Sequence, residues 1–163
     1  HFKQEKICMA ERTHGYYVKL VEENYFGSVT RQDKDAILAC FTEEARVTIY
    51  HGDNEPRRFS GKSRTGDSPL GTFFDHLLAN YDPAFEDFTH YVDVANDRCA
   101  AHFKVHLTPK PDSPYLKVGV LVLQNCNFFR CRDGKIDDMI LYYSNPSAAK
   151  SGQPMPTGFP KQE

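Results

Sequence analysis

The sequence has no concentration of charge of either sign. Its 20 basic and 22 acidic residues are dispersed and leave a formal net charge of −2. That balance offers no electrostatic footprint for nucleic acid or for an acidic membrane surface. No apolar run approaches the roughly 20 residues that cross a bilayer, and no secretory signal pattern is present. We therefore expect neither a nucleic-acid nor a membrane partner.

A cysteine framework is also missing. The five cysteines are an odd number without a Cys-x-x-Cys pair, and Cys126 and Cys131 are spaced to face opposite sides of a strand. Neither a disulfide scaffold nor a metal cluster follows from this pattern, and the sequence has no glycine-rich phosphate loop. The expectations are no metal, no cofactor, reduced thiols and a cytoplasmic location.

Apolar periodicity places helices first and strands later in a chain of 163 residues, which suits one domain. Helices are predicted over about 11–29, 33–41 and 70–81. Strands are predicted over about 45–51, 58–59, 85–94, 99–108, 115–132 and 136–144. An Asp-Gly step at 133–134 predicts a hairpin between the last two strands. With no repeat or linker, the prediction is one α+β domain over residues 11–146.

Two terminal segments lie outside this pattern. Residues 1–10 are expected to be an N-terminal extension or an expression remnant, with Met9 a candidate start. Residues 147–163 are proline-rich and are predicted to form an extended tail. We expect that tail to run over the surface and to anchor Met155 and Phe159 in a groove.

Three short motifs, taken in order, make the chain similar to a known superfamily. They are Tyr25 followed by Asp33-Lys34-Asp35-Ala36-Ile37-Leu38, then Phe41-Thr42-Glu43-Glu44-Ala45-Arg46-Val47, then Arg132-Asp133-Gly134-Lys135-Ile136. Over about residues 15–146 the chain resembles the nuclear transport factor 2-like superfamily. Its small-molecule members include ketosteroid isomerase, scytalone dehydratase, bile-acid dehydratases and SnoaL-type polyketide cyclases. The resemblance implies a cone: a curved, mainly antiparallel β-sheet wrapped around three N-terminal helices, with a central pocket.

The resemblance assigns catalytic chemistry to two side chains. Tyr25 falls where ketosteroid isomerase and the bile-acid dehydratases place a pocket tyrosine, which can donate a hydrogen bond to a substrate oxygen. His90 matches the strand histidine that the dehydratases use in acid/base chemistry, and an imidazole titrates near neutral pH. A core tyrosine and a hydrogen-bonded structural histidine are the alternatives for the two residues.

The strand that precedes the hairpin carries two carboxamides on an otherwise apolar face. Strict alternation puts Asn125 and Asn127 on the face of Leu123 and Phe129. Buried amides need partners from the protein, from water or from a bound molecule. We expect both to bind a substrate oxygen, the alternative being bonds to each other or to a buried water.

Ile49 marks a departure from the family pattern. The general-base carboxylate of ketosteroid isomerase corresponds to Ile49, which cannot accept a proton, and the turn aspartate of the dehydratases is replaced in the region of Ser28-Val29-Thr30. Tyr50 is among the nearest polar substitutes. We expect Ile49 and Tyr50 to line the substrate pocket.

These expectations favour a cofactor-independent lyase or isomerase, dehydratase-like or cyclase-like, that acts on a hydrophobic oxygenated small molecule such as a polyketide, a terpenoid or a steroid-like ring. The expected catalytic residues are His90 and Tyr25; the expected substrate-binding residues are Asn125, Asn127, Tyr50 and Ile49. The missing carboxylates favour the alternative, a non-catalytic ligand-binding or assembly subunit of the same fold. A polar cavity reached by His90 would support the enzyme, and a filled cone would contradict it.

The outer face of the predicted sheet mixes polar and apolar side chains. Val122, Gln124, Cys126 and Phe128 are expected there, beside His102, Lys104 and His106 of the neighbouring strand. Members of the superfamily commonly pair through their sheets, so we expect a homodimer.

Overall fold

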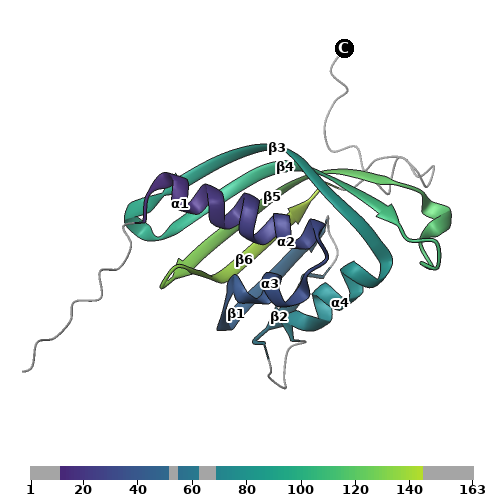
Figure 1. Ribbon diagram of the computed structural model, residues 1–163, viewed down its shortest axis with the longest axis horizontal. Coiled ribbons are helices and arrows are strands. Elements are labelled where there is room, and N and C mark those ends of the chain that lie inside the picture. The colour runs from purple at the N-terminus through teal and green to yellow at the C-terminus, as the bar shows by residue number, and fades with distance from the viewer. Residues whose placement is uncertain (1–11, 52–54, 63–68, 145–163) are drawn as a thin grey trace, which may run out of the picture.

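A six-stranded sheet forms the body of the molecule in the computed structural model, which describes residues 12–51, 55–62 and 69–144 (Figure 1). The strands are β1 (Phe41–His51), β2 (Arg57–Ser60), β3 (Tyr81–Asp93), β4 (Arg98–Pro109), β5 (Leu121–Arg132) and β6 (Lys135–Tyr143). Their order across the sheet is β2-β1-β6-β5-β4-β3. Every neighbouring pair is antiparallel except β1 and β6, so the expected mainly antiparallel sheet is confirmed.

Helices cover one face of this curved sheet (Figure 1). The first runs without a break through α1 (His14–Val18), η1 (Lys19–Phe26) and α2 (Gly27–Thr30). It is followed by α3 (Lys34–Ala39) and, after β2, by α4 (Leu70–Asn80). Asp33 caps α3, since its carboxylate accepts a hydrogen bond of 3.0 Å from the Ala36 amide. All three helical segments end within three residues of the expected positions, and the α+β cone is confirmed.

The middle of the first helix has π-type backbone hydrogen bonding over Lys19–Phe26. Sequence periodicity did not predict this geometry, which is rare and frequently found at functional sites. The segment carries Glu22, Tyr25 and Phe26. The π-type geometry of this segment therefore affects which of its side chains face the sheet.

Two strand boundaries differ from the expected ones for local reasons. β3 already begins at Tyr81, before the expected start near residue 85, and contains Pro83. Proline is tolerated there because β3 is an edge strand and needs no amide on its free side. β5 begins only at Leu121, because Leu116–Val118 forms a 3₁₀ turn that ends at Gly119 with φ of 75°.

Aromatic side chains fill the space between the helices and the inner, helix-covered face of the sheet. The Tyr25 ring lies 5.5 Å from that of Phe41, 6.2 Å from Phe74 and 6.1 Å from Phe129, measured between ring centroids. All four side chains are buried. Packing of these rings holds the first helix and α4 against β1 and β5.

The predicted hairpin between β5 and β6 is present. Asp133 and Gly134 both have positive φ, 51° and 78°, as a two-residue turn of this kind requires. A bulge follows: Cys131 pairs with Ile136, but Arg130 pairs with Asp138. The one-residue shift places Tyr143, rather than Tyr142, opposite Asn125.

Several expectations fall on residues outside the described part of the chain. These are the N-terminal extension of residues 1–10, the tail of residues 147–163 and the anchoring of Met155 and Phe159.

Candidate functional site

A small cavity lies between the helices and the inner face of the sheet, with a volume of about 40 Å³. Most of its wall is apolar: Phe26 from the first helix, Phe73 and Leu77 from α4, Phe85 from β3 and Phe103 from β4 all contribute. Such a volume holds little more than ordered water. The cone is therefore nearly filled in this state, and a larger ligand has to displace side chains.

Four polar side chains, Tyr25, Asn125, Asn127 and Tyr143, line the same cavity and are here called the inner polar cluster. Asn125 is only 4% exposed and Asn127 only 1%. Strand pairing sets their surroundings: Asn125 lies between Phe103 on β4 and Tyr143 on β6. The sequence expectation that Tyr25, Asn125 and Asn127 lie together at a buried polar spot agrees with this geometry.

The amide oxygens of this cluster are unpaired. Among the residues that the structure describes, neither the Oδ1 of Asn125 nor that of Asn127 has a hydrogen-bond partner. The Asn127 amide nitrogen donates a long contact of 3.8 Å to the Met139 sulfur, a weak acceptor. Because buried polar groups in proteins are nearly always paired, two such oxygens side by side call for an explanation.

The two phenols of the cluster keep their protons. Burial raises the pKa of Tyr25 well above its usual value, and the neighbouring Tyr143 raises it further. Burial also raises the pKa of Tyr143 to about 12. At neutral pH both hydroxyls are therefore hydrogen-bond donors and weak acids rather than bases.

His90 does not line this cavity. Its side chain is 11% exposed, and its Nε2 lies 2.9 Å from a carboxylate oxygen of Glu22 on the first helix. The imidazole stacks on Phe88 with 5.7 Å between ring centroids. Phe88 in turn contacts Phe26 and Phe103, which do line the cavity. One aromatic layer thus separates the histidine from the inner polar cluster.

Glu22 is the carboxylate partner that sequence reasoning did not find for His90. The available signal was its helical position, one turn before Tyr25 and Phe26 on a helix whose apolar stripe faces the sheet. A histidine held against a carboxylate can take up and return a proton. The pair lies at the edge of the inner face, where Glu22 is still 45% exposed.

Neither Ile49 nor Tyr50, both expected in the substrate pocket, lines this cavity. Ile49 is buried in the core but does not line the cavity. Tyr50 lies on the outer face, where its ring stacks on Tyr142 at 5.0 Å. Consecutive strand residues point to opposite faces, so the two could not have shared one pocket.

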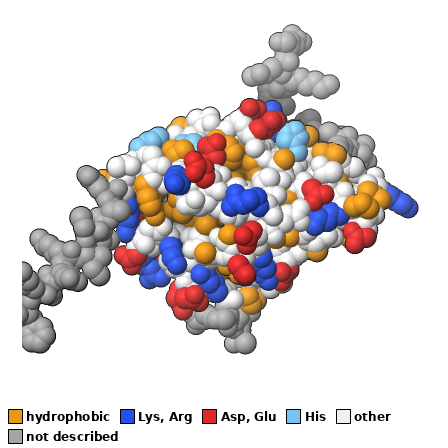
Figure 2. Space-filling model, in the orientation of Figure 1, with side chains coloured by type: hydrophobic (Ala, Val, Ile, Leu, Met, Phe, Trp, Pro, Cys, Tyr) orange, Lys and Arg blue, Asp and Glu red, His pale blue; other side chains and the backbone are white. Residues whose placement is uncertain are grey.

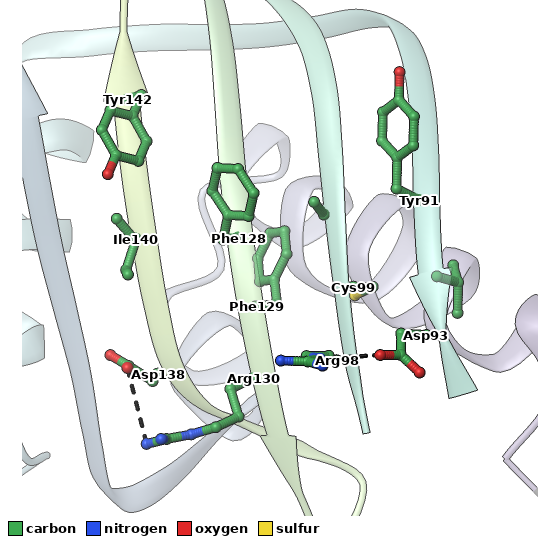
Figure 3. A pocket seen from close by; sticks show the side chains of 12 residues that line it. Tyr91, Asp93, Arg98, Cys99, Phe128, Phe129, Arg130, Asp138, Ile140 and Tyr142 are labelled. Carbon is green, nitrogen blue, oxygen red and sulfur yellow. Dashed lines mark hydrogen bonds and ion pairs between the residues drawn. The ribbon is translucent and has the colours of Figure 1, made fainter. Parts of the chain in front are cut away.

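The outer face holds a much larger hollow, of about 660 Å³, here called the outer groove. Figure 3 shows Tyr91, Phe128, Ile140 and Tyr142 along it. Two ion pairs lie at one end: Arg98 with Asp93 at 3.0 Å and Arg130 with Asp138 at 3.8 Å.

Charge on the surface shown in Figure 2 is mixed. Acidic and basic side chains alternate there without a patch of one sign. Within the described residues, no group of three or more histidine, cysteine or acidic side chains is arranged to hold a metal. None of the helices in residues 12–51, 55–62 and 69–144 has the length and apolar character needed to cross a membrane.

Comparison with known proteins identifies the family. The model of the SnoaL-like domain matches residues 23–139, which is more than half of the chain. The chain belongs to the SnoaL-like family. The resemblance to the nuclear transport factor 2-like superfamily is thereby confirmed. No curated protein matches the sequence.

Solved structures similar to this SnoaL-like protein agree with the assignment. A candidate isomerase from Bacillus subtilis superposes with a TM-score of 0.65 at 16% identity, over 84% of this chain and 91% of its own. A candidate polyketide cyclase from Xanthomonas campestris gives 0.61 at 25% identity, over 80% and 91%. Another from Pseudomonas putida gives 0.60 at 26% identity, over 77% and 89%.

Proposed function

We propose that this SnoaL-like protein is a cofactor-independent lyase or isomerase that acts on a hydrophobic, oxygen-bearing small molecule such as a polyketide, a terpenoid or a steroid-like ring. The observation that carries the proposal is the inner polar cluster: two buried amides with unpaired oxygens beside two protonated phenols, within an aromatic wall. Apolar walls with a few convergent polar groups are the usual composition of small-molecule sites. The similarity to candidate polyketide cyclases supports the same substrate class.

The proposed reaction needs a hydrogen-bond donor and a group that transfers a proton. Tyr25 lines the cavity, and its hydroxyl is the group that would donate a hydrogen bond to a substrate oxygen as negative charge develops there. His90, held by Glu22, supplies proton transfer. For both to reach one substrate, that substrate has to displace the Phe88 ring, which separates them.

A second candidate function, non-catalytic ligand binding, is favoured by three observations. No side chain that titrates near neutral pH lines the cavity among the described residues, and Ile49 stands where the isomerase pattern has its base. The cone is also nearly filled and His90 does not line its cavity, which is the outcome expected for a binding module rather than for the enzyme. Both functions use the same cavity and differ in whether a product forms.

A two-stage experiment separates the candidates. Thermal shift against a panel of aromatic and terpenoid alcohols and ketones finds binders, because a ligand of the folded state raises the melting temperature. Each binder is then incubated with the protein, and mass spectrometry and chromatography look for loss of water or an isomer. Product formation supports the enzyme, stable binding without product supports the binding module, and no binder in the panel would contradict both.

We also propose that the protein is a homodimer that pairs through its outer face. Tyr91 is 62% exposed there, and Phe128 and Tyr142 are each 47% exposed. Patches of this kind on soluble proteins mark interaction sites. The rim carries arginine and aspartate together, so a second copy meets a surface of mixed charge there rather than one of a single sign.

A cytoplasmic location is the remaining proposal. Cys40, Cys99, Cys126 and Cys131 are all free, and this suits a reducing compartment.

A further inference from the structure

The inner polar cluster presents hydrogen-bond acceptors at its amide end. The Asn127 nitrogen points to the Met139 sulfur at 3.8 Å, so its Oδ1 points away from that sulfur. Rotating the amide by half a turn would place the oxygen against the thioether, which is itself an acceptor. The orientation with the oxygen free is therefore the favourable one, and the Oδ1 of Asn125 is free as well.

Nothing in the described part of the fold uses these acceptors. Across the strands, Asn127 faces Ala101 and Leu141, neither of which has a side-chain donor. Asn125 faces Phe103 and Tyr143, yet its oxygen remains unpaired. A buried acceptor without a partner is costly to keep. A fold that keeps two of them side by side is suited to a ligand that brings the donor.

We infer that the group which this site recognises is a hydroxyl, so that the ligand is an alcohol rather than a ketone, an ether or an epoxide. Its O–H donates to Asn125 or Asn127, and its oxygen accepts from the hydroxyl of Tyr25 or Tyr143. The inference rests on the proposed function only in assuming that the ligand enters this cavity.

A carbonyl compound satisfies only half of this arrangement. Its oxygen accepts from the phenols, but it has no hydrogen for the amide oxygens, which then stay unpaired in a dry site. Sites built to pair with a hydroxyl strongly reject analogues that lack it. The high pKa values of both phenols agree with this division, since they remain donors throughout the neutral range.

The small size of the cavity limits which part of the ligand the inner polar cluster can recognise. About 40 Å³ accommodates a hydroxyl and the carbon that bears it. The rest of the skeleton extends past Leu77, Phe85 and Leu107, which are half-buried and line the same cavity. Selectivity for the hydroxyl is therefore compatible with a range of ring systems.

The test is a matched pair of probes, 1-indanol and 1-indanone, which share a skeleton and differ in C–OH against C=O. Isothermal titration with the wild-type protein should show 1-indanol binding roughly 10- to 100-fold more tightly, the ratio that one satisfied acceptor produces. The side-chain amide NMR signals of Asn125 and Asn127 should shift with the alcohol. Equal affinity, or a preference for the ketone, would overturn the inference while leaving ligand binding in the cavity intact. Absence of binding by both probes, with unchanged amide signals, would overturn the inference and count against the proposed function.

Variants localise the effect. Asn127→Leu keeps the approximate shape and deletes the acceptor, so the preference for 1-indanol should fall toward parity. Gln124→Leu is the matched control, because Gln124 lies on the same strand but is exposed on the outer face. An unchanged preference in Asn127→Leu and in the equivalent Asn125→Leu would refute the assignment. If neither variant folds, the wild-type comparison still decides.

Discussion

The two faces of the sheet carry opposite kinds of hollow. The inner cavity measures about 40 Å³, is closed by aromatic rings and contains amides with unpaired oxygens. The outer groove measures about 660 Å³, is open and aromatic, and has its charges already paired at the rim. Volume alone would select the outer groove as the ligand site.

The buried groups without hydrogen-bond partners indicate that the inner cavity is the ligand site instead. A small ligand gains specificity from buried groups that lack partners, and these lie inside. A broad apolar surface with paired charges suits a flat protein partner. β5 serves both surfaces, because Asn125 and Asn127 point inward while Phe128 points outward.

The largest expected effect concerns catalysis on the inner side. Once a substrate is known, His90→Gln should lower turnover roughly 10²- to 10⁴-fold, the usual contribution of a positioned acid or base. His102→Gln is the control, since His102 is an exposed histidine of β4. Steady-state kinetics on both variants measures the difference. Turnover that survives in His90→Gln assigns proton transfer to another group.

The next effect concerns assembly through the outer groove. Phe128→Asp should weaken the dimer by about 4 kcal/mol, roughly 1,000-fold, because a central aromatic contact contributes about 2 kcal/mol and is lost twice in a two-fold interface. Analytical ultracentrifugation at low micromolar concentration measures it.

Val118→Asp is the matched control for assembly, since Val118 is 50% exposed on the 3₁₀ turn rather than on the sheet. A wild-type protein that is monomeric at this concentration would contradict the proposal, as would a Phe128→Asp protein that remains dimeric.

A smaller effect concerns stability. Asn127→Leu should raise the free energy of unfolding by about 1–3 kcal/mol, because it removes an unsatisfied buried acceptor and adds apolar contact. Gln124→Leu on the exposed face should change it by no more than about 0.5 kcal/mol. Denaturant unfolding measures both. A destabilised Asn127→Leu would indicate that the amide has a structural partner after all.

The smallest effect concerns pH. Burial raises the pKa of Tyr143 to about 12 in the folded protein, above the ordinary value of about 10. The protonated phenol is thus favoured by folding, and its contribution to stability is complete below about pH 10 and is lost as the pH rises toward 12. Tyr143→Phe should therefore lose less stability between pH 8 and pH 11 than the wild type. An identical loss in the two proteins would contradict the burial of this phenol.

β5 and β6 show most clearly which features could be predicted from the sequence and which could not. Alternation alone placed Asn125 and Asn127 inside and Phe128 outside, as the structure has them. It did not place Tyr143 in the cluster, because that depends on the bulge between Arg130 and Cys131. A one-residue register shift of this kind leaves no simple mark in the sequence.

β3 shows the same limit. A second bulge, at Asp87 with φ of 58°, allows Phe85 and Phe88 to face inward together. Phe85 lines the cavity, and Phe88 lies between the cavity and His90. The family resemblance assigned His90 to the site, but the sequence did not predict that the Phe88 ring separates it from the inner polar cluster.

A crystal structure of the protein with 1-indanol would show whether the inner cavity is the ligand site. The account predicts the alcohol in the inner cavity, with its hydroxyl within hydrogen-bonding distance of the Oδ1 of Asn125 or Asn127. The side chain of Phe85 or of Leu77 should be displaced to admit the skeleton. An alcohol bound in the outer groove, with the inner cavity unchanged and both amide oxygens still unpaired, would contradict it.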